Sequence, residues 1–410
     1  MKPLINDSRL EKQRWVVFLL ACLILVCAGA NYAWSVFAQP LAQHLKGDIG
    51  DIAFAFSLAS CCSPVAMLIA GWVSDHFGPK PMIILGGLMM GGAFVGCSYA
   101  SDALTVIVVY GVVFGLGMGA TFSSTTGNVL KFFPDRSGFI SGLAMAAYGA
   151  SSVIIPPVAM YLLTRWGVQH AFFILGVAFI VIVVAGGVFS TRCPAGFVPR
   201  GFVPKKAVDG HILSLNTFEM MKTKRFWFMW GMGVCGALAG MMAISYAAMI
   251  AQFQMRYEPA ACAMVVSVVA IGNMSGRFIA GVLSDYIGRV PTLFLAQLLN
   301  FLGMLLLWSC GPGDNGLFVI AVVSLGLAFG AYMGVYPSLT TEEFGPAHNS
   351  ANYGMMVVGF SSTAMIGPYI MNICYSRYGE FSQAYMIGLG ITFLGFLFGY
   401  FLKRALSQKA

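Results

Sequence analysis

Charged residues are scarce in this sequence of 410 residues, because Asp, Glu, Lys and Arg together make up only 9% of it. A soluble domain carries about 25% charged residues, so this class of protein is excluded. Apolar residues make up 59% of the chain, and long apolar runs recur from Val16 to Leu402. Runs of about 18 or more residues are long enough to cross a membrane as helices. The sequence therefore predicts an all-α polytopic membrane protein.

The chain has only one long polar stretch, at residues 191–225. Asn216 and Thr217 open a short amphipathic segment within it. Six apolar spans lie on each side of this stretch, which divides the chain into an N-terminal half (1–190), a central loop (191–225) and a C-terminal half (226–410). The twelve predicted spans are residues 15–37, 51–74, 81–100, 103–129, 139–163, 170–190, 226–252, 259–284, 290–310, 315–340, 350–374 and 382–402.

The net charge of +8 does not indicate a nucleic-acid partner, because the basic residues follow the predicted topology. If both termini are cytoplasmic, cytoplasmic segments hold 18 of the 23 Lys and Arg residues, and the outer loops hold four. This asymmetry is the positive-inside rule, and it predicts cytoplasmic termini. Positions 1–14 carry charges of both signs without a cleavage-type site, so the first span is expected to be a helix rather than a removed signal.

Residue patterns typical of enzymes are absent from the sequence. The ten cysteines are scattered through apolar segments without metal-ligand or disulfide spacing, so they are interpreted as small core residues. No Ser/His/Asp set, metal cluster or phosphate-binding loop is present. Glycine pairs such as Gly86-Gly87 lie within a span, where they allow helices to approach closely. We expect neither an enzyme nor a cofactor.

The two halves of the chain are related by an internal repeat. Gly71–Pro81 matches Gly281–Pro291 at an offset of 210 residues. Two further matches have nearly the same offset: Gly115, Gly119 and Ser123 with Gly326, Gly330 and Gly334, and Pro156 with Pro368. The pattern predicts a duplicated six-helix unit with a site near the membrane midplane between its copies.

The repeated turn has the form G-x-x-x-D-x-x-G and resembles the signature of the major facilitator superfamily. Gly71 and Gly281 would allow close helix contact, and Asp75 and Asp285 could accept hydrogen bonds from N–H groups at a neighbouring helix end. The resemblance implies that these two aspartates have a gating role, stabilising a conformer closed on the cytoplasmic side. The alternative is a solvent-exposed turn in which the aspartate is an ordinary helix N-cap.

Three further motifs resemble the oxalate/formate antiporter group, and the wider monocarboxylate transporter family shares their general plan. They are Asn31–Pro40 in the first span, Lys131–Gly138 after the fourth, and Asn273-x-x-x-Arg277 in the eighth. The likeness to the major facilitator superfamily covers the whole chain, and within it the chain also resembles bacterial monocarboxylate transporters of the lactate type. It implies a carboxylate carrier of the plasma membrane, the inner membrane of a bacterium.

Arg277 is the only Lys or Arg within any predicted span. It precedes Asp285 by eight residues, which places it about 12 Å above the turn and close to the membrane midplane. A lone cation there costs about 3 kcal/mol. Asn273 lies four residues earlier on the same helix face and could orient the guanidinium or bond a hydroxyl or carbonyl group of the substrate. Since the fifteen acidic residues all fall in loops or at span ends, a bound carboxylate is the expected partner rather than a protein carboxylate.

Other residues are expected to line the same site. Tyr332 and Tyr336 share one face of the tenth span, while Gly326, Gly330 and Gly334 form a second stripe that should face a neighbouring helix. The tyrosines would then project elsewhere, into the cavity or into packing. Asn31 is polar at membrane depth and should face protein or cavity, with Tyr32 a weaker candidate. The remaining candidates, for which core packing is the alternative, are Phe122 and Tyr148.

The eleventh span differs from that of oxalate/formate exchangers, which carry a lysine there. Aligned from Asn352-Tyr353-Gly354, the equivalent position is Phe360, and no Lys or Arg occurs between Ala351 and Asn372. A dianion would leave its second charge uncompensated in a low-dielectric site, at a cost of several kcal/mol. A monoanion such as lactate, pyruvate, formate or acetate is therefore favoured over oxalate.

The predicted mechanism is alternating access. The monocarboxylate resemblance implies proton symport, but no Asp, Glu or His lies inside the spans away from their ends to form a proton route, and exchange of carboxylates is the alternative. Sugar or drug transport is disfavoured, because few Asn and Gln residues lie in the spans. A non-transporting anion sensor is disfavoured by the lack of a soluble output domain. The expected partners are a carboxylate, a proton and the lipid bilayer, with the chain acting as a monomer.

Overall fold

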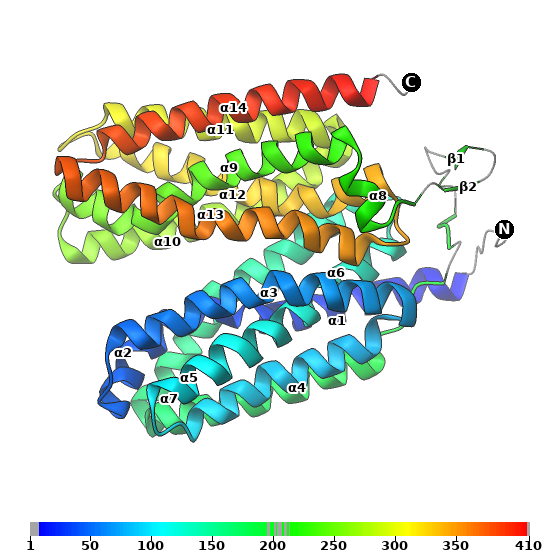
Figure 1. Ribbon diagram of the computed structural model, residues 1–410, viewed down its shortest axis with the longest axis horizontal. Helices are drawn as coiled ribbons and strands as arrows, with labels where there is room; N and C mark the ends of the chain where they lie inside the picture. The colour runs from blue at the N-terminus through cyan, green and yellow to red at the C-terminus, as the bar shows by residue number, and fades with distance from the viewer. Residues whose placement is uncertain are drawn as a thin grey trace. The chain divides into compact units, whose positions relative to one another are not determined.

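The computed structural model describes residues 8–194, 197–200, 202, 207–208, 211–212 and 214–407, and most of these residues are helical (Figure 1). The first half contains α1 (Ser8–Ala28), the 3-10 helix η1 (Gly29–Ala33), α2 (Trp34–Leu45), α3 (Ile49–Phe77), α4 (Pro79–Ser98), α5 (Ala103–Val106), the π-helix η2 (Ile107–Phe114), α6 (Gly115–Phe132) and α7 (Ser137–Phe189). The second half contains α8 (Thr217–Met221), α9 (Lys224–Met249), the π-helix η3 (Ile250–Gln254), α10 (Pro259–Ile287), α11 (Arg289–Ser309), α12 (Asn315–Phe344), α13 (Asn349–Tyr378) and α14 (Ser382–Ser407).

Eleven helical stretches of the described chain are long and apolar enough to cross a membrane. One of them, α7, holds two predicted spans, because Gly167 adopts φ 77° and ψ 175° and interrupts the helix. Each of the twelve predicted spans therefore lies on helix. The prediction of an all-α polytopic membrane protein is confirmed.

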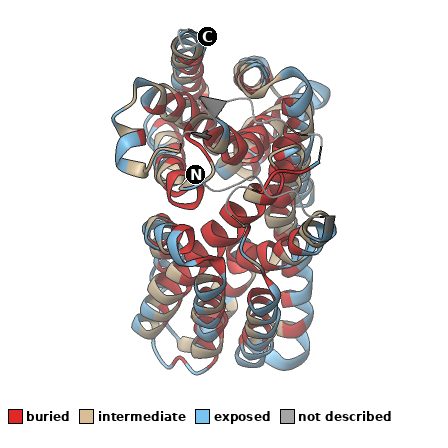
Figure 2. Cartoon of the chain, turned by 90° about the vertical axis from the view of Figure 1, so that its right-hand side faces the viewer, coloured by how far each residue is buried: buried red, intermediate tan, exposed pale blue. Residues whose placement is uncertain are grey.

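The chain forms two compact units. Unit 1 comprises Met1–Ile140, Ala147–Thr217 and Thr340–Met355, and unit 2 comprises Ser141–Ala146, Phe218–Leu339 and Met356–Ala410. Buried residues run along the inward faces of the helices in each unit (Figure 2). Each half of the sequence therefore contributes one short segment to the unit formed mainly by the other half.

The predicted repeat is reproduced in the packing of the helices. In unit 1, a Cβ atom on Gly119 of α6 would overlap the carbonyl oxygen of Ser63 in α3. In unit 2, a Cβ atom on Gly330 of α12 would overlap the carbonyl oxygen of Asn273 in α10. Since Ser63 and Asn273 are related by the offset of 210 residues, both units use the same close helix contact. The prediction that the glycine stripe of the tenth span faces a neighbouring helix closely is confirmed.

The repeated turn has one backbone conformation in both units. Gly78 has φ 96° and ψ 162°, and Gly288 has φ 93° and ψ 160°. The amide of each glycine donates to the carbonyl of the serine four residues earlier, Ser74 at 2.9 Å and Ser284 at 3.1 Å. A positive φ of this size is readily adopted only by glycine, which explains the residue at both positions.

The central loop is held at both ends by hydrogen bonds within unit 1. At its start, Asn128 of α6 donates its side-chain amide to the Thr191 carbonyl at 2.9 Å. At its end, the Leu215 amide donates to the Phe344 carbonyl at 2.8 Å. Between them lies a two-stranded antiparallel pair, β1 (Ala207–Val208) and β2 (His211–Ile212). The predicted amphipathic segment is present as α8. The basic residues of the central loop include Lys205 and Lys206, which lie outside the described residues.

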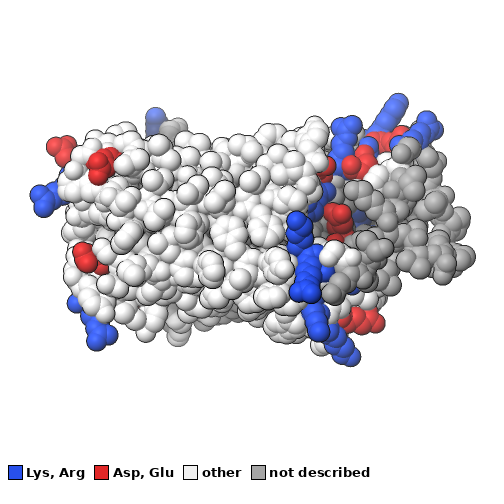
Figure 3. All heavy atoms as spheres, turned by 90° about the horizontal axis from the view of Figure 1, so that it is seen from above, with Lys and Arg blue, Asp and Glu red and all other residues white. Residues whose placement is uncertain are grey.

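At the surface, charged side chains lie near the ends of the helices. On the face shown in Figure 3, Lys, Arg, Asp and Glu residues gather towards the two ends, and a wide surface between them carries no charge. This distribution is expected of helices whose middle parts contact hydrocarbon, where an exposed charge is unfavourable.

Candidate functional site

Arg277 lies on α10 in unit 2 and is only 2% exposed. Its Nε donates to Asn273 Oδ1 at 3.1 Å, so the predicted pairing across one helical turn is confirmed. Its Nη1 donates to the backbone carbonyl of Met145 in α7 at 2.9 Å. These two hydrogen bonds, to a side-chain amide oxygen and to a backbone carbonyl, fix the plane of the guanidinium.

The contact between α7 and Arg277 depends on small residues that sequence reasoning missed. A Cβ atom on Gly142 would lie 2.6 Å from the Arg277 carbonyl oxygen and 2.8 Å from the Gly281 Cα. One residue earlier, the Ser141 hydroxyl donates to the Gly334 carbonyl at 2.6 Å. The backbone of α7 therefore lies directly against α10 and α12, which brings the Met145 carbonyl within reach of the guanidinium.

Tyr332 and Tyr336 on α12 are fully buried, and both hydroxyl groups donate to protein acceptors. The Tyr332 hydroxyl donates to Gln297 Oε1, and the Tyr336 hydroxyl donates to the Met229 carbonyl at 2.8 Å. The Tyr332 ring fills the space beside Gly236 of α9, where a Cβ atom would overlap it. In this arrangement the two tyrosines join α12 to neighbouring helices, and their role as substrate ligands stays a prediction. The signal that sequence reasoning missed is Gln297, an amide within the ninth span.

Phe360 on α13 is 7% exposed and packs its ring against Tyr336, with centroids 5.0 Å apart in an edge-to-face arrangement. A Cβ atom on Gly233 of α9 would lie 2.6 Å from the Phe360 ring. The position aligned with the lysine of oxalate/formate exchangers is thus a buried aromatic ring beside a tyrosine.

The candidate residues of the N-terminal half lie together in unit 1. Asn31 on η1 is buried and accepts a hydrogen bond from the Tyr110 hydroxyl at 3.1 Å. Tyr32 is 40% exposed, and its ring lies 5.7 Å from that of Tyr148. The Tyr148 ring in turn lies 5.0 Å from that of Phe122. The structure therefore brings Tyr32, Tyr148 and Phe122 into one aromatic row, whereas the Asn31 amide oxygen faces Tyr110.

Asp75 is the more buried of the two aspartates predicted to act in gating, with a side chain only 1% exposed. Its Oδ1 pairs with Lys131 Nζ at 2.6 Å, and its Oδ2 accepts a hydrogen bond from the Ala351 amide at 3.2 Å. Ala351 lies in the first turn of α13, so the carboxylate also meets the positive end of a helix dipole. The prediction that this aspartate accepts a hydrogen bond from a neighbouring helix end is confirmed.

Gly71 makes the approach of α3 to α13 possible. A Cβ atom on Gly71 would lie 2.7 Å from the Ala351 amide nitrogen and from the Ser350 carbonyl carbon. Arg192, at the start of the central loop, donates from Nη2 to the Asp75 backbone carbonyl at 2.9 Å. The turn after α3, the end of α6, the start of α13 and the central loop therefore meet around one carboxylate.

Asp285 occupies the equivalent turn of unit 2 in a more exposed setting. Its Oδ1 pairs with Nη1 of Arg289, four residues later, at 2.8 Å, and its side chain is 24% exposed. An ion pair between neighbouring residues at a surface contributes less than a buried pair that joins separate helices. The repeat thus preserves the turn, while the surroundings of its two aspartates differ.

We expect Asp75→Asn to destabilise the protein more than Asp285→Asn does. Asparagine is isosteric and still offers an oxygen to the Ala351 amide, but it loses the charged hydrogen bond to Lys131, worth about 2 kcal/mol. The exposed pair of Asp285 contributes less than about 1 kcal/mol. Thermal unfolding of both purified variants in detergent would measure the difference. Equal unfolding temperatures would show that the Asp75–Lys131 pair contributes no more to stability than the Asp285–Arg289 pair.

Comparisons with known proteins agree with this architecture. The sequence profile of the Major Facilitator Superfamily matches residues 19–279 and 233–409. YhjX of Escherichia coli strain K12, described as an uncharacterized MFS-type transporter, is 28% identical over 87% of this chain and 87% of its own length. The oxalate:formate antiporter of Oxalobacter formigenes is 23% identical over 97% of this chain and 93% of its own length. Human monocarboxylate transporter 11 is 25% identical over 90% of this chain and 78% of its own length.

Solved structures match the fold over nearly the whole chain. The crystal structure of FucP in the outward conformation superimposes with a TM-score of 0.73 at 15% identity, covering 95% of this chain and 99% of FucP. A bacterial homologue of the iron transporter ferroportin, in an outward-facing state, superimposes with a TM-score of 0.72 at 12% identity, again covering 95% and 99%. At such identities these matches concern the fold alone, and they confirm the predicted architecture.

Proposed function

The chain belongs to the major facilitator superfamily, and on that premise we propose that it carries small monocarboxylate anions of the lactate and pyruvate type across a membrane. The carrier opens its site to one side at a time, as alternating access requires. Proton-coupled symport is the proposed mode, with carboxylate exchange as the alternative.

The observation that carries this proposal is the environment of Arg277. The guanidinium is 2% exposed in a membrane-spanning helix, where a bound carboxylate would offset the unfavourable burial of its charge. Its planar fork matches a carboxylate, which can accept two parallel hydrogen bonds. Asn273 and the Met145 carbonyl hold the fork in one orientation, which lowers the entropy lost when a substrate binds.

Relatives of the chain support a carboxylate as substrate. By their names, the Oxalobacter formigenes protein exchanges oxalate and formate, and human monocarboxylate transporter 11 carries monocarboxylates. Both alignments span at least 90% of this chain. The resemblance predicted from short motifs therefore extends along the full sequence.

Phe360 supports a monoanion rather than a dianion. Its ring is buried against Tyr336, at the position that the resemblance aligns with the lysine of oxalate/formate exchangers. One guanidinium balances one carboxylate, and an unbalanced charge at this depth costs several kcal/mol. Lactate, pyruvate, formate and acetate are thus the proposed substrates, and oxalate is disfavoured by its second charge.

The remaining predicted residues take supporting roles in the proposal. Within unit 2, Tyr332 and Tyr336 are proposed ligands of the substrate, and within unit 1, Asn31 and Phe122 are proposed lining residues. The second supporting group is the aspartate pair of the repeated turns. Asp75, through Lys131 and the start of α13, stabilises a conformer closed on the cytoplasmic side, and Asp285 has the corresponding role in its own turn. We place the protein in a bacterial inner membrane with both termini in the cytoplasm.

Uptake of labelled L-lactate into proteoliposomes tests the function and its coupling together. We expect an inward proton gradient to accelerate uptake several-fold, and a protonophore to abolish that acceleration. Liposomes preloaded with unlabelled lactate, at equal pH on both sides, test for exchange. Uptake of labelled lactate only into these preloaded liposomes would make the protein an exchanger. Transport of oxalate without transport of lactate would contradict the selectivity argued from Phe360.

A further inference from the structure

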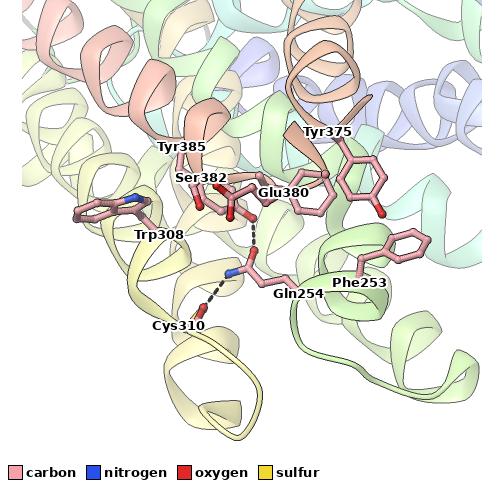
Figure 4. Close-up of a pocket in the computed structure, with 10 residues that line it drawn as sticks. Phe253, Gln254, Trp308, Cys310, Tyr375, Glu380, Ser382 and Tyr385 are labelled. Atoms are coloured by element: carbon pink, nitrogen blue, oxygen red, sulfur yellow. Dashed lines mark hydrogen bonds between the residues drawn. The ribbon is translucent and has the colours of Figure 1, made fainter. Parts of the chain in front are cut away.

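A second site lies in unit 2, away from Arg277. An open cavity of about 290 Å³ lies where η3 and the end of α11 meet the loop from α13 to α14 (Figure 4). We call it the aromatic cavity, and the residues that matter here are Phe253, Gln254, Trp308, Tyr375, Glu380 and Tyr385.

Aromatic rings form the walls of the aromatic cavity. Figure 4 shows Trp308 on one side and Phe253 and Tyr375 on the other. The Phe253 and Tyr375 rings lie 5.3 Å apart, whereas Trp308 and Phe253 are each about half exposed. Wide ring faces at a water-accessible cavity attract cations, because the face of an aromatic ring carries negative potential.

At the base of the cavity, the Gln254 side chain forms hydrogen bonds with the neighbouring polar groups. Its amide nitrogen donates to the carbonyls of Leu307 and Cys310, both at 2.8 Å, and its amide oxygen accepts from the Tyr385 hydroxyl at 2.7 Å. These bonds use both donor hydrogens of the amide, and the groups that can still form hydrogen bonds are oxygen lone pairs, which accept them. The base is therefore richer in acceptors than in donors.

Glu380 gives the cavity its charge. It lies at the exposed loop between α13 and α14, and it forms no ion pair within the described part of the chain. The nearest basic residue along the chain, Arg377, lies over the ring of Tyr378, with its guanidinium carbon 5.9 Å from the ring centroid. An anion such as the proposed substrate would be repelled by this carboxylate, so the cavity is not a second carboxylate site.

We propose that the aromatic cavity binds a small organic ammonium group. A carboxylate, aromatic faces and acceptor oxygens are the three features that recognise an ammonium ion, through charge, cation–π attraction and hydrogen bonding. The group is supplied either by a free quaternary ammonium ion such as choline, which uses the charge and the ring faces, or by the headgroup of an ethanolamine lipid, whose N–H groups also donate to the acceptor oxygens. This inference is independent of the proposed transport function, because it involves neither Arg277 nor the substrate route.

Binding of choline to the full-length protein in detergent, measured by calorimetry, tests the proposal. The probe is compared with 3,3-dimethylbutanol, which has the shape of choline without its charge. We expect choline to bind at least about tenfold more tightly than the neutral compound, as a cation–π contact of about 1.4 kcal/mol would give. Glu380→Gln and Trp308→Ala should each remove that preference.

Glu258→Gln is the matched control for Glu380→Gln. Glu258 is exposed, lies in the same unit just before α10 and makes no side-chain cap bond, so its replacement removes one charge without touching the cavity. Unchanged elution and unfolding temperature would show that all variants remain folded.

A second arm distinguishes the two sources of the ammonium group. The protein is purified from membranes and analysed by native mass spectrometry for retained phosphatidylethanolamine and phosphatidylglycerol. Retention of the ethanolamine lipid that depends on Glu380, without binding of choline, would assign the cavity to a lipid headgroup. Binding of neither probe, or binding that Glu380→Gln leaves unchanged, would overturn the proposal.

Discussion

Replacing Arg277 with alanine is expected to lower monocarboxylate uptake by about a hundredfold, which corresponds to the loss of about 3 kcal/mol of charged hydrogen bonding. Arg277→Lys keeps the charge but presents a point donor instead of a planar fork, so we expect an intermediate loss of about tenfold. Initial rates of labelled L-lactate uptake in proteoliposomes, at equal protein density, measure both effects.

Two comparisons separate a ligand role of Arg277 from a structural one. Arg277 also joins α10 to α7 through the Met145 carbonyl, so Arg277→Ala is expected to lower the unfolding temperature as well. Arg165→Ala removes an exposed cation near the Gly167 break and should leave uptake unchanged. If correctly folded Arg277→Ala protein carried lactate at the wild-type rate, the guanidinium would not be the substrate ligand.

Gly330→Ala is expected to have the second large effect, although it adds only one methyl group. The new Cβ would overlap the carbonyl oxygen of Asn273 and lie 2.9 Å from the amide nitrogen of Arg277. Both are backbone atoms of α10, so α10 and α12 must separate, which costs about 1–3 kcal/mol. Since Arg277 moves with α10, we expect a lower unfolding temperature and at least about tenfold slower uptake.

The control for Gly330→Ala is Gly390→Ala in α14. A Cβ atom on Gly390 has no neighbour within 4 Å, and alanine is the better helix former by about 1 kcal/mol. This variant should therefore be as stable as the wild type or more stable. Equal unfolding temperatures and uptake rates of the two variants would mean that transport does not depend on the close contact between α10 and α12.

Local features of the sequence determined the number and limits of the spans. Apolar length alone separates helices from loops, because the hydrocarbon core sets a minimum length that each run must meet. Helical spacing placed Asn273 and Arg277 within bonding distance, and the offset of 210 residues led to the glycine contacts of both units. These features depend on residues close in sequence or on a repeat that the sequence itself displays.

The tertiary structure decided which partner each polar group meets. The Met145 carbonyl lies 132 residues from Arg277, and the Ala351 amide lies 276 residues from Asp75. The phenols predicted to face a substrate donate to protein acceptors, Gln297 for Tyr332 and Met229 for Tyr336. Hydrogen-bond partners in a low-dielectric interior follow from which helices pack together, and no local pattern encodes that choice.

The two aspartates and the aromatic cavity also show what local sequence determines and what tertiary packing decides. The sequence alone determined that Asp75 and Asp285 occupy equivalent turns, because the motif is repeated with its glycine. Only packing buries Asp75 between helices and leaves Asp285 beside Arg289. Likewise, Trp308 and Glu380 are ordinary residues of helix end and loop until folding brings α11 beside the start of α14. Burial and charge compensation arise from contacts between distant segments, and a site built on them becomes visible only in three dimensions.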